Sequence, residues 1–295
     1  MSRIFAFVLL IFASVPLFAQ QYSLSFGLYT GVAGSFTSDK GIDADPRYQG
    51  GFEAKLAPIG LNMGVDYEGF GFMLSPGIIN VGQNFYVVNT QGGHDGLREI
   101  NLRYLSVPLS FKFNLVRFYA FKLSAVASVA PSFLLDGHDQ LSHRSSKMHF
   151  PAEVYPMLPS DYVIEYDGVL APEINHYVIS EKKDFRDLQV FAGAGFRTDW
   201  DPSNHWRISV DLRVNYGIFD SRSEVYMKNL ESTVGLYERA TERRDMFAQF
   251  TIGISRYIEF DRSEHERSRR IRGSSKRFKP SQFPGQRIRL TNPKD

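Results

Sequence analysis

The stretch "LRYLSVPLSFKFN" (residues 102–114) decides how the rest of the chain is interpreted. Every second residue from position 105 is apolar, namely Leu105, Val107, Leu109, Phe111 and Phe113, and the residues between them are Ser106, Pro108, Ser110 and Lys112. Strict alternation predicts a β-strand with two different faces. The apolar face meets either a protein core, as in a soluble sandwich, or lipid. Pro108 removes one ladder hydrogen bond and predicts a bulge or bend on the lumen side.

The N-terminus has the features of a secretory signal peptide. One basic residue, Arg3, precedes an apolar run from Ile4 to about Phe18. The run is shorter than the roughly 20 apolar residues of a spanning helix, and it matches the h-region of an export signal. A buried N-terminal helix is the alternative, but the run has no polar helical face. We expect residues 1–19 to be removed after Ala19.

The composition excludes a helical membrane protein. Hydrophobic residues make up 43% of the chain, and no second long apolar run follows the signal. A membrane β-barrel stays compatible because only every second residue of its strands is apolar. The chain has no Cys, which excludes disulfides and a lipid anchor on Cys. We find no cofactor motif, and an exported chain makes nucleic acid an unlikely partner.

The alternation of the opening stretch recurs along the chain. Eight ladders are predicted: 22–36, 59–67, 70–78, 105–113, 119–135, 188–200, 206–218 and 246–260. Their phase shifts around Ala57-Pro58, which predicts a bulge in the second strand. Aromatic residues stand at ladder ends, as interface girdles require: Tyr22, Tyr67, Tyr119, Trp200, Trp206 and Phe260.

Short and long connections alternate strictly between the ladders. The short ones are 68–69, about 115–117 and 201–205, and the long ones are 37–51, roughly 83–98, 136–187 and 219–245. Tight periplasmic turns and long outer loops are typical of bacterial outer-membrane barrels. We therefore predict an all-β fold: an eight-stranded, antiparallel, up-and-down transmembrane β-barrel over residues 20–260. Its long loops are external, and both termini are periplasmic.

Charged residues lie opposite the apolar ladders and are expected to point into the lumen. They are Lys112, Lys122, Arg197, Asp199, Arg207, Asp211, Arg213 and Glu259. An eight-stranded barrel is just wide enough for its side chains. Unpaired buried charge is costly, so we interpret these residues as a paired polar filling rather than a conduit.

Several of these strands resemble the PorT-type outer-membrane β-barrel family. The similar stretches are "RYLSVPLSFKF" (103–113), "FAGAGFRTDW" (191–200), "RISVDLRVNYGIFD" (207–220) and "QFTIGISRYIEF" (249–260). The resemblance covers roughly residues 20–260 and implies an outer-membrane location and a link to type IX protein secretion. The chain departs from the family pattern in its third long loop and in its basic C-terminal tail.

The third long loop contains residues that could form a metal site or a hydrolytic site. His138, His143, His149 and His176 lie there with Asp136, Asp139 and Glu153, but their spacing matches no tight metal motif. In "SHRSS" (142–146), His143 and Ser145 share one face of a strand, as a lipid A deacylase or phospholipase would need. Solvated loop residues explain both sets more simply, so neither a metal nor a catalytic residue is assigned.

The third loop and the tail are the expected contact surfaces. Loop 136–187 has ten acidic and five basic residues and is predicted to recognise an external ligand. Residues 261–295 form a basic tail, expected to be disordered and to dock on an acidic periplasmic protein or anionic headgroups. The tail residues assigned to docking are Arg267, Arg269, Arg270, Arg272, Lys276, Arg277 and Lys279.

These observations favour a non-enzymatic outer-membrane barrel that acts as an assembly or docking component, in contact with outer-membrane lipid. Two alternatives stay open. One is a barrel enzyme that acts on envelope lipid, and the other is a surface barrel whose long loops bind a ligand.

Overall fold

A computed structural model describes residues 21–52, 54–56, 58–67, 69–203, 205–232 and 235–261. The predicted signal peptide and tail residues 262–295 lie outside the described residues. The chain divides into two compact units, and the larger one, Ser23–Glu259, contains the barrel. Of the smaller unit the structure describes four residues, among which the rings of Tyr22 and Phe260 stack with centroids 5.0 Å apart.

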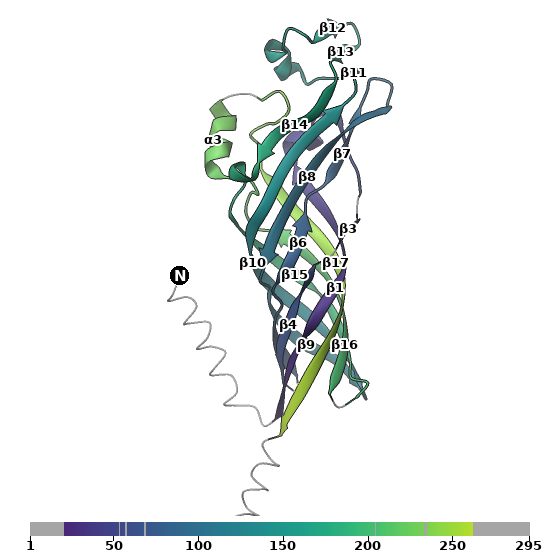
Figure 1. The fold of residues 1–295 in the computed structure, drawn as a ribbon, viewed down its shortest axis with the longest axis vertical. Coiled ribbons are helices and arrows are strands. Elements are labelled where there is room, and N and C mark those ends of the chain that lie inside the picture. The colour runs from purple at the N-terminus through teal and green to yellow at the C-terminus, as the bar shows by residue number, and fades with distance from the viewer. Residues whose placement is uncertain are drawn as a thin grey trace, which may run out of the picture. The chain divides into compact units, whose positions relative to one another are not determined.

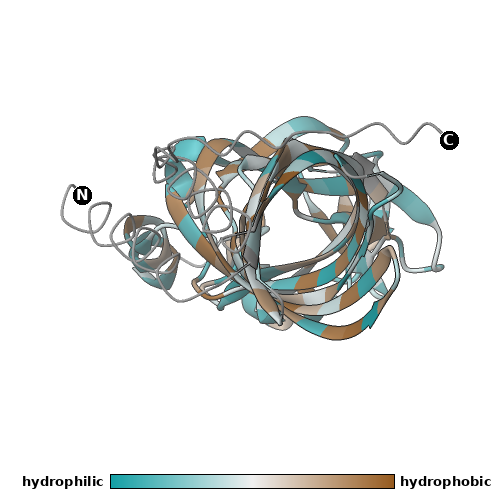
Figure 2. Cartoon of the chain, turned by 90° about the horizontal axis from the view of Figure 1, so that it is seen from below, coloured by the Kyte–Doolittle hydropathy of each residue, from teal (hydrophilic) through white to brown (hydrophobic). Residues whose placement is uncertain are grey.

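Eight antiparallel strands close the barrel, which confirms the predicted fold class (Figures 1 and 2). In chain order they are β1 (Gln21–Asp39); β2 (Tyr48–Gly50), β3 (Ala54–Leu56) and β4 (Ile59–Asp66); β5 (Phe70–Leu74), β6 (Gly77–Val81) and β7 (Asn84–Val88); β8 (His94–Ser106) and β9 (Leu109–Phe118); β10 (Phe121–His143); β14 (Ile174–Glu181) and β15 (Leu188–Trp200); β16 (Trp206–Gly217); and β17 (Arg243–Asp261). The barrel is closed because β1 lies between the last strand, β17, and the second strand, with which it pairs through β4.

The remaining elements all lie at one end of the barrel. They are α2 (Lys40–Asp43), β11 (Ser146–Met148), the 3-10 helix η2 (Ala152–Met157), β12 (Val163–Glu165), β13 (Gly168–Ala171), the 3-10 helix η3 (Lys182–Asp184) and α3 (Glu224–Ser232). We call this the loop end. The opposite end, where short connections follow β4, β9 and β15, is the turn end. No helix in the described part of the chain is long and apolar enough to span a membrane.

Two local irregularities follow from proline. Between the pairs Tyr29–Gly60 and Val32–Leu56 the second strand has three residues and β1 has two, which confirms the predicted bulge. Pro108 separates β8 from β9. The register with β10 is nevertheless unchanged, because the pairs Ser106–Ser132 and Leu109–Val129 are three residues apart on both strands. The strand is therefore interrupted there without a bulge, because proline lacks the N–H that the ladder needs.

A wide belt of exposed apolar side chains surrounds the spanning strands. It includes Leu24, Phe26 and Leu28 of β1, Phe111 and Phe113 of β9, Val129 and Phe133 of β10, Phe196 of β15, Leu212 and Val214 of β16, and Phe250, Ile252 and Ile254 of β17. Trp200 and Trp206 are half exposed at the turn end of this belt. An outward apolar band edged by aromatic rings is the surface that lipid requires.

The barrel wall continues beyond this belt toward the loop end. There the apolar side chains point inward and the polar side chains point outward. On β8, Leu105 is exposed, but Tyr104, Leu102 and Ile100 point inward and are buried, while Arg103 is exposed. The predicted connection 83–98 is therefore wrong: β7 and β8 occupy most of it, joined by residues 89–93. Likewise, β10 extends to His143 and β14 pairs with it, so 136–187 is not one long loop. Outside the bilayer a wall needs polar residues outside and apolar residues inside.

An apolar layer fills the barrel interior at this level. Its residues are Ile79, Val81, Leu102, Tyr104, Ala130, Leu134, Phe185, Phe191 and Phe247, all buried. Phe191 packs edge-on against Tyr104 and Phe247, with centroids 5.8 and 5.2 Å apart. The layer separates two groups of charged residues inside the barrel, one toward each end.

Candidate functional site

The first charged group lies toward the turn end and contains seven of the eight predicted lumen residues. We call it the turn-end ionic layer, and its members are Asp66, Lys112, Lys122, Arg197, Asp199, Asp201, Arg207, Asp211 and Arg213. The strands bring them together because alternate residues of β4, β9, β10, β15 and β16 point inward. Asp66 and Asp201 were not predicted, since they lie at the ends of strands.

Most charges in the turn-end ionic layer have an opposite charge close by. Lys112 Nζ lies 2.6 Å from Asp66 Oδ1 and 3.3 Å from Asp199 Oδ2. Arg207 pairs with Asp66 and also with Asp201, where Nε and Oδ1 are 2.7 Å apart. Such pairing offsets the desolvation of buried charge.

The other two arginines of this layer each bond to an aspartate two residues away on the same strand. Arg197 Nε donates to Asp199 Oδ1 at 2.8 Å, and Arg213 Nη2 donates to Asp211 Oδ2 at 2.6 Å. Glu259 does not belong to the layer and is exposed, contrary to its predicted position. It lies past Arg256, the last residue of β17 that pairs with β16, so no neighbouring strand on that side covers it.

A small cavity adjoins the turn-end ionic layer. It has a volume of about 30 Å³, and its lining includes Tyr29, Asp211, Arg213 and Asn215. A space of this size holds one or two water molecules but not a small-molecule ligand, which needs several hundred cubic ångströms. This cavity is therefore too small to be a substrate site.

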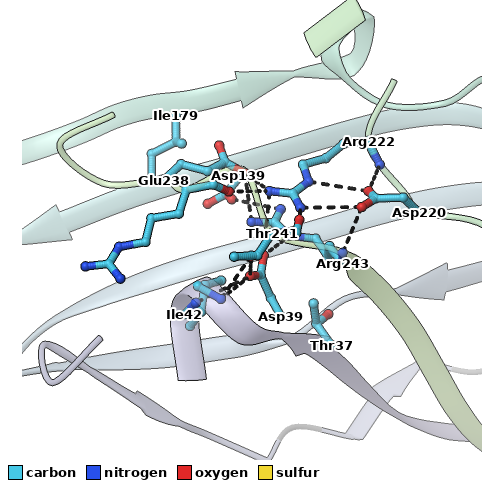
Figure 3. Close-up of polar contacts among 12 residues, drawn as sticks. Thr37, Asp39, Ile42, Asp139, Ile179, Asp220, Arg222, Glu238, Thr241 and Arg243 are labelled. Atoms are coloured by element: carbon cyan, nitrogen blue, oxygen red, sulfur yellow. Dashed lines mark hydrogen bonds and ion pairs between the residues drawn. The ribbon is translucent and has the colours of Figure 1, made fainter. Parts of the chain in front are cut away.

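The second charged group lies toward the loop end and was missed by the sequence analysis (Figure 3). We call it the loop-end ionic layer, and its members are Asp39, Arg98, Asp139, Asp220, Arg222, Glu238 and Arg243. Arg98, Asp139, Arg222 and Arg243 are completely buried. A signal existed in the sequence: the alternation inverts over 99–104, which places Arg98 on the inner face with Ile100 and Leu102.

Arg243 is the centre of the loop-end ionic layer. Its Nε donates to Asp39 Oδ2 at 2.8 Å, its Nη1 to Asp139 Oδ2 at 3.2 Å, and its Nη2 to Glu238 Oε1 at 3.0 Å. Arg98 binds Asp139 through two parallel hydrogen bonds of 2.9 and 2.7 Å. One guanidinium therefore ties together β1, β10 and the segment before β17.

The same layer includes residues from the connection between β16 and β17. Arg222 Nη1 donates to Glu238 Oε1 at 3.0 Å, and Tyr226 Oη donates to Glu238 Oε2 at 2.5 Å. Burial, followed by the charge of Glu238, raises the pKa of Tyr226 above its ordinary value. The tyrosine therefore stays protonated and serves as a donor.

Two carboxyl groups of this layer, those of Asp39 and Asp139, are held in their charged form. Burial alone would raise the pKa of Asp139, but Arg98 and Arg243 outweigh it and lower the pKa below its ordinary value. For Asp39 burial is again opposed, here by Arg243 and Arg222, and its pKa is also lowered. These two aspartates are therefore held as ion pairs with their arginine partners at neutral pH.

Residues 144–173 form a folded cap over the loop end. β11, β13 and β12 make a three-stranded sheet, and η2 packs beside it. The core of the cap contains Met148, Phe150, Val154, Tyr162, Val169 and Ala171 and continues into Val87, Leu141 and Tyr237 of neighbouring segments. The guanidinium of Arg47 lies 4.2 Å from the ring centre of Phe150, and Tyr162 and Tyr237 share a hydrogen bond. The predicted recognition loop is thus an ordered element with its own core.

The two residues considered for hydrolysis, Ser145 and His143, both have other hydrogen-bond partners. Ser145 Oγ donates to the carbonyl of Ala171 at 3.1 Å, and His143 Nδ1 bonds to the carbonyl of Arg144 at 2.9 Å. Burial lowers the pKa of His143. In the described residues no group of three or more His, Asp or Glu side chains could hold a metal ion. The tail residues predicted to dock lie outside the described part of the chain.

Comparison with known proteins places this architecture among membrane barrels. The sequence profile of the family described as "Outer membrane protein beta-barrel domain" matches residues 18–223. No curated protein matches the chain.

Solved barrels are similar over most of the chain at low identity. Ail of Yersinia pestis, in complex with a heparin analogue, is 13% identical, with 81% of this chain and 99% of that chain covered and a TM-score of 0.31. The outer membrane protease OmpT of Escherichia coli is 8% identical, with 82% and 98% covered and a TM-score of 0.39. OprG of Pseudomonas aeruginosa is 10% identical, with 81% and 96% covered and a TM-score of 0.34.

Proposed function

Because the chain belongs to the outer membrane protein beta-barrel domain family, we propose that it is a non-enzymatic barrel that docks another protein through its cap. The family supports a location in the bacterial outer membrane, where the exposed apolar belt contacts lipid. In this proposal the loop end faces the outside of the cell and both chain ends lie in the periplasm.

One observation carries the proposal: an ordered cap stands on a barrel whose interior is filled. Two ionic layers and the apolar layer between them occupy the interior. A pore would need a continuous polar path, and a hydrolase would need a nucleophile beside a base at the bilayer surface. A rigid wall that carries a folded surface element suits recognition of another macromolecule.

The resemblance to the PorT-type family narrows the class of partner. It supports a role as an assembly or docking component of the envelope, linked to type IX protein secretion. The basic tail adds a second contact in this proposal, with an acidic periplasmic protein or the anionic headgroups of the inner leaflet. Arginine suits bidentate contact with carboxylate or phosphate groups.

The test is complementation of a strain from which the gene has been deleted. We would express the wild-type chain, a chain with residues 146–171 replaced by a short Gly-Ser linker, and a chain truncated after Arg262. The docking function predicts that all three insert, that the first restores export of secreted cargo, and that the cap-replaced chain does not. Full restoration by the cap-replaced chain would contradict docking through the cap.

The tail and the enzymatic alternative are distinguished by the same strains. If the truncated chain keeps every partner in crosslinking at low and high salt, docking by the tail is wrong. If deletion of the gene changes the envelope lipids, and if Ser145→Ala and His143→Ala each cause the same change, the hydrolase is favoured. The proposal expects envelope lipids identical to those of the wild type.

A further inference from the structure

The cap sheet has one edge that is engaged and one that is free. β11 is at one edge, where the Thr90 N–H donates to the Lys147 carbonyl at 2.9 Å. β12 is at the other edge and pairs only with β13, with Val163 opposite Leu170 and Ile164 opposite Val169. Within the described part of the chain, no strand lies on the outer side of β12. A free edge presents backbone N–H and C=O groups to which another chain can add.

The side chains on this edge are apolar and exposed. Val163 is 52% exposed and Ile164 is 60% exposed, and Tyr166 in the adjoining turn is fully exposed. Natural edge strands are usually protected by lysine, proline or an inward charge, which keep other chains away. β12 has only Glu165 for this purpose. Exposed apolar residues at an edge are favourable contacts for a partner strand.

Two ion pairs of Lys147 connect the turn beside β12 to β11. Lys147 Nζ lies 2.5 Å from Glu165 Oε2 and 2.8 Å from Asp167 Oδ1. Gly168 follows the turn with φ of 153°, a conformation that favours glycine. Below the strand, the buried ring of Tyr162 anchors it to the cap core. Because β12 is already folded as a strand of the cap sheet, we expect binding at this edge to cost little ordering of the protein.

The surroundings of the edge are acidic. The exposed carboxylates of the cap are Glu153, Asp161, Glu165, Asp167 and Glu173, of which Glu153 pairs with Arg239 at 3.4 Å, and the basic side chains of the cap are Arg144 and Lys147. Lys147 is already paired with two of these carboxylates. A partner with basic residues is therefore favoured over an acidic one.

From these observations we propose that the free edge of β12 is the docking site for an extended, basic segment of another protein, which adds as a fourth strand to the cap sheet. Backbone hydrogen bonds to β12 hold the segment, Val163, Ile164 and Tyr166 contact its apolar residues, and the cap carboxylates contact its basic residues. This inference rests on the proposed docking function and names the chemistry of its partner.

The experiment uses the full chain in detergent micelles and a phage-displayed library of random twelve-residue peptides. We expect enriched peptides to alternate apolar and basic residues and to bind the wild-type chain. Ile164→Lys places a charge on the edge that repels a basic strand, and it should weaken binding at least tenfold. Val225→Lys is the matched control because Val225 is 71% exposed on α3. It should change binding less than twofold.

Several outcomes would overturn the inference. These are no enrichment, enrichment of acidic peptides, and equal binding by Ile164→Lys and the wild type. Self-association that Ile164→Lys abolishes would assign the edge to a second copy of this chain instead. Heat-modified migration on a gel shows whether each variant is folded, and Tyr166→Ser provides a second variant that adds no charge.

The chain with residues 146–171 replaced separates this inference from the proposed function. If cap replacement abolishes cargo export in cells but Ile164→Lys leaves peptide binding unchanged, the docking function stands and the edge is wrong. If cap replacement changes neither peptide binding nor export, both fail.

Discussion

Arg243 Nη1 lies 3.2 Å from Asp139 Oδ2, although the two residues are 104 positions apart and both side chains are completely buried. The same guanidinium reaches Asp39 and Glu238. One residue at the start of β17 thus joins the first, fifth and eighth strands where the apolar belt ends. Buried ion pairs therefore connect distant strands inside the loop end of the barrel.

Replacement of Arg243 should be strongly destabilising. Arg243→Met leaves Asp39, Asp139 and Glu238 with fewer cationic partners, and loss of one member of a buried pair costs about 3–5 kcal/mol. We expect the free energy of unfolding to fall by that amount in urea titrations in lipid vesicles. Arg244→Met is the control, because Arg244 pairs with Glu242 at the exposed surface and should cost less than about 1 kcal/mol. Equal effects of the two variants would contradict the central position of Arg243.

The loop end should resist mild acid and open in strong acid. The pKa values of Asp39 and Asp139 are lower in the folded state, since their arginine partners outweigh burial. Such groups contribute stability above the unfolded pKa of about 3.9, and the contribution is lost as pH falls through the folded pKa. We expect protease resistance of the cap to be constant from pH 7 to 5 and to fall below about pH 4. Unchanged resistance at pH 2.5, measured with pepsin, would show that these pairs do not hold the cap.

Closure of the barrel should be sensitive to Gly27. A Cβ at this position would overlap the carbonyl oxygen of Ile254 on β17, and a backbone atom cannot move aside. Gly27→Ala is expected to prevent β1 from closing against β17, so the heat-modified band on a gel should be lost. Gly69→Ala is the control, because a Cβ there has open space around it. A folded Gly27→Ala barrel would argue against this contact.

The absence of Cys gives a direct test of orientation in the membrane. Tyr166 at the loop end and Tyr119 at the turn end are both almost fully exposed. A membrane-impermeant maleimide should label Tyr166→Cys on intact cells but should label Tyr119→Cys only after the outer membrane is permeabilised. Labelling in the opposite order would reverse the proposed topology.

The filled interior predicts a barrel that does not conduct. Reconstituted wild-type protein should give no steady current in planar bilayers in which a porin gives its usual conductance. Arg197→Ala combined with Arg213→Ala removes part of the turn-end ionic layer, yet the variant should still not conduct. The apolar layer around Phe191 and Phe247 remains in place. A stable current from the wild type would contradict a filled lumen.

The spanning strands could be predicted because lipid imposes one rule on the sequence. In "LSVPLSFKF" (105–113) each outward residue must be apolar, and each inward residue can be polar because it finds partners in the lumen. The alternation therefore identified eight strands, and it identified Lys112 and Arg213 as inward residues. It could not identify which carboxylate each would meet, because pairing depends on register across several strands. Asp66 and Asp201 lie where the alternation stops.

Only the tertiary structure decided what happens beyond the bilayer. Leu102, Tyr104 and Leu105 all lie on β8, but Leu102 and Tyr104 point inward and Leu105 points outward. The apolar residues alternate with period two on both sides of the bilayer surface. The sequence therefore does not show where the environment of the outer face changes from lipid to water. The inverted strands, the loop-end ionic layer and the cap depend on contacts between distant segments, such as Arg98 with Asp139 and Tyr162 with Tyr237. No local pattern specifies those contacts, since they form only when the barrel brings the segments together.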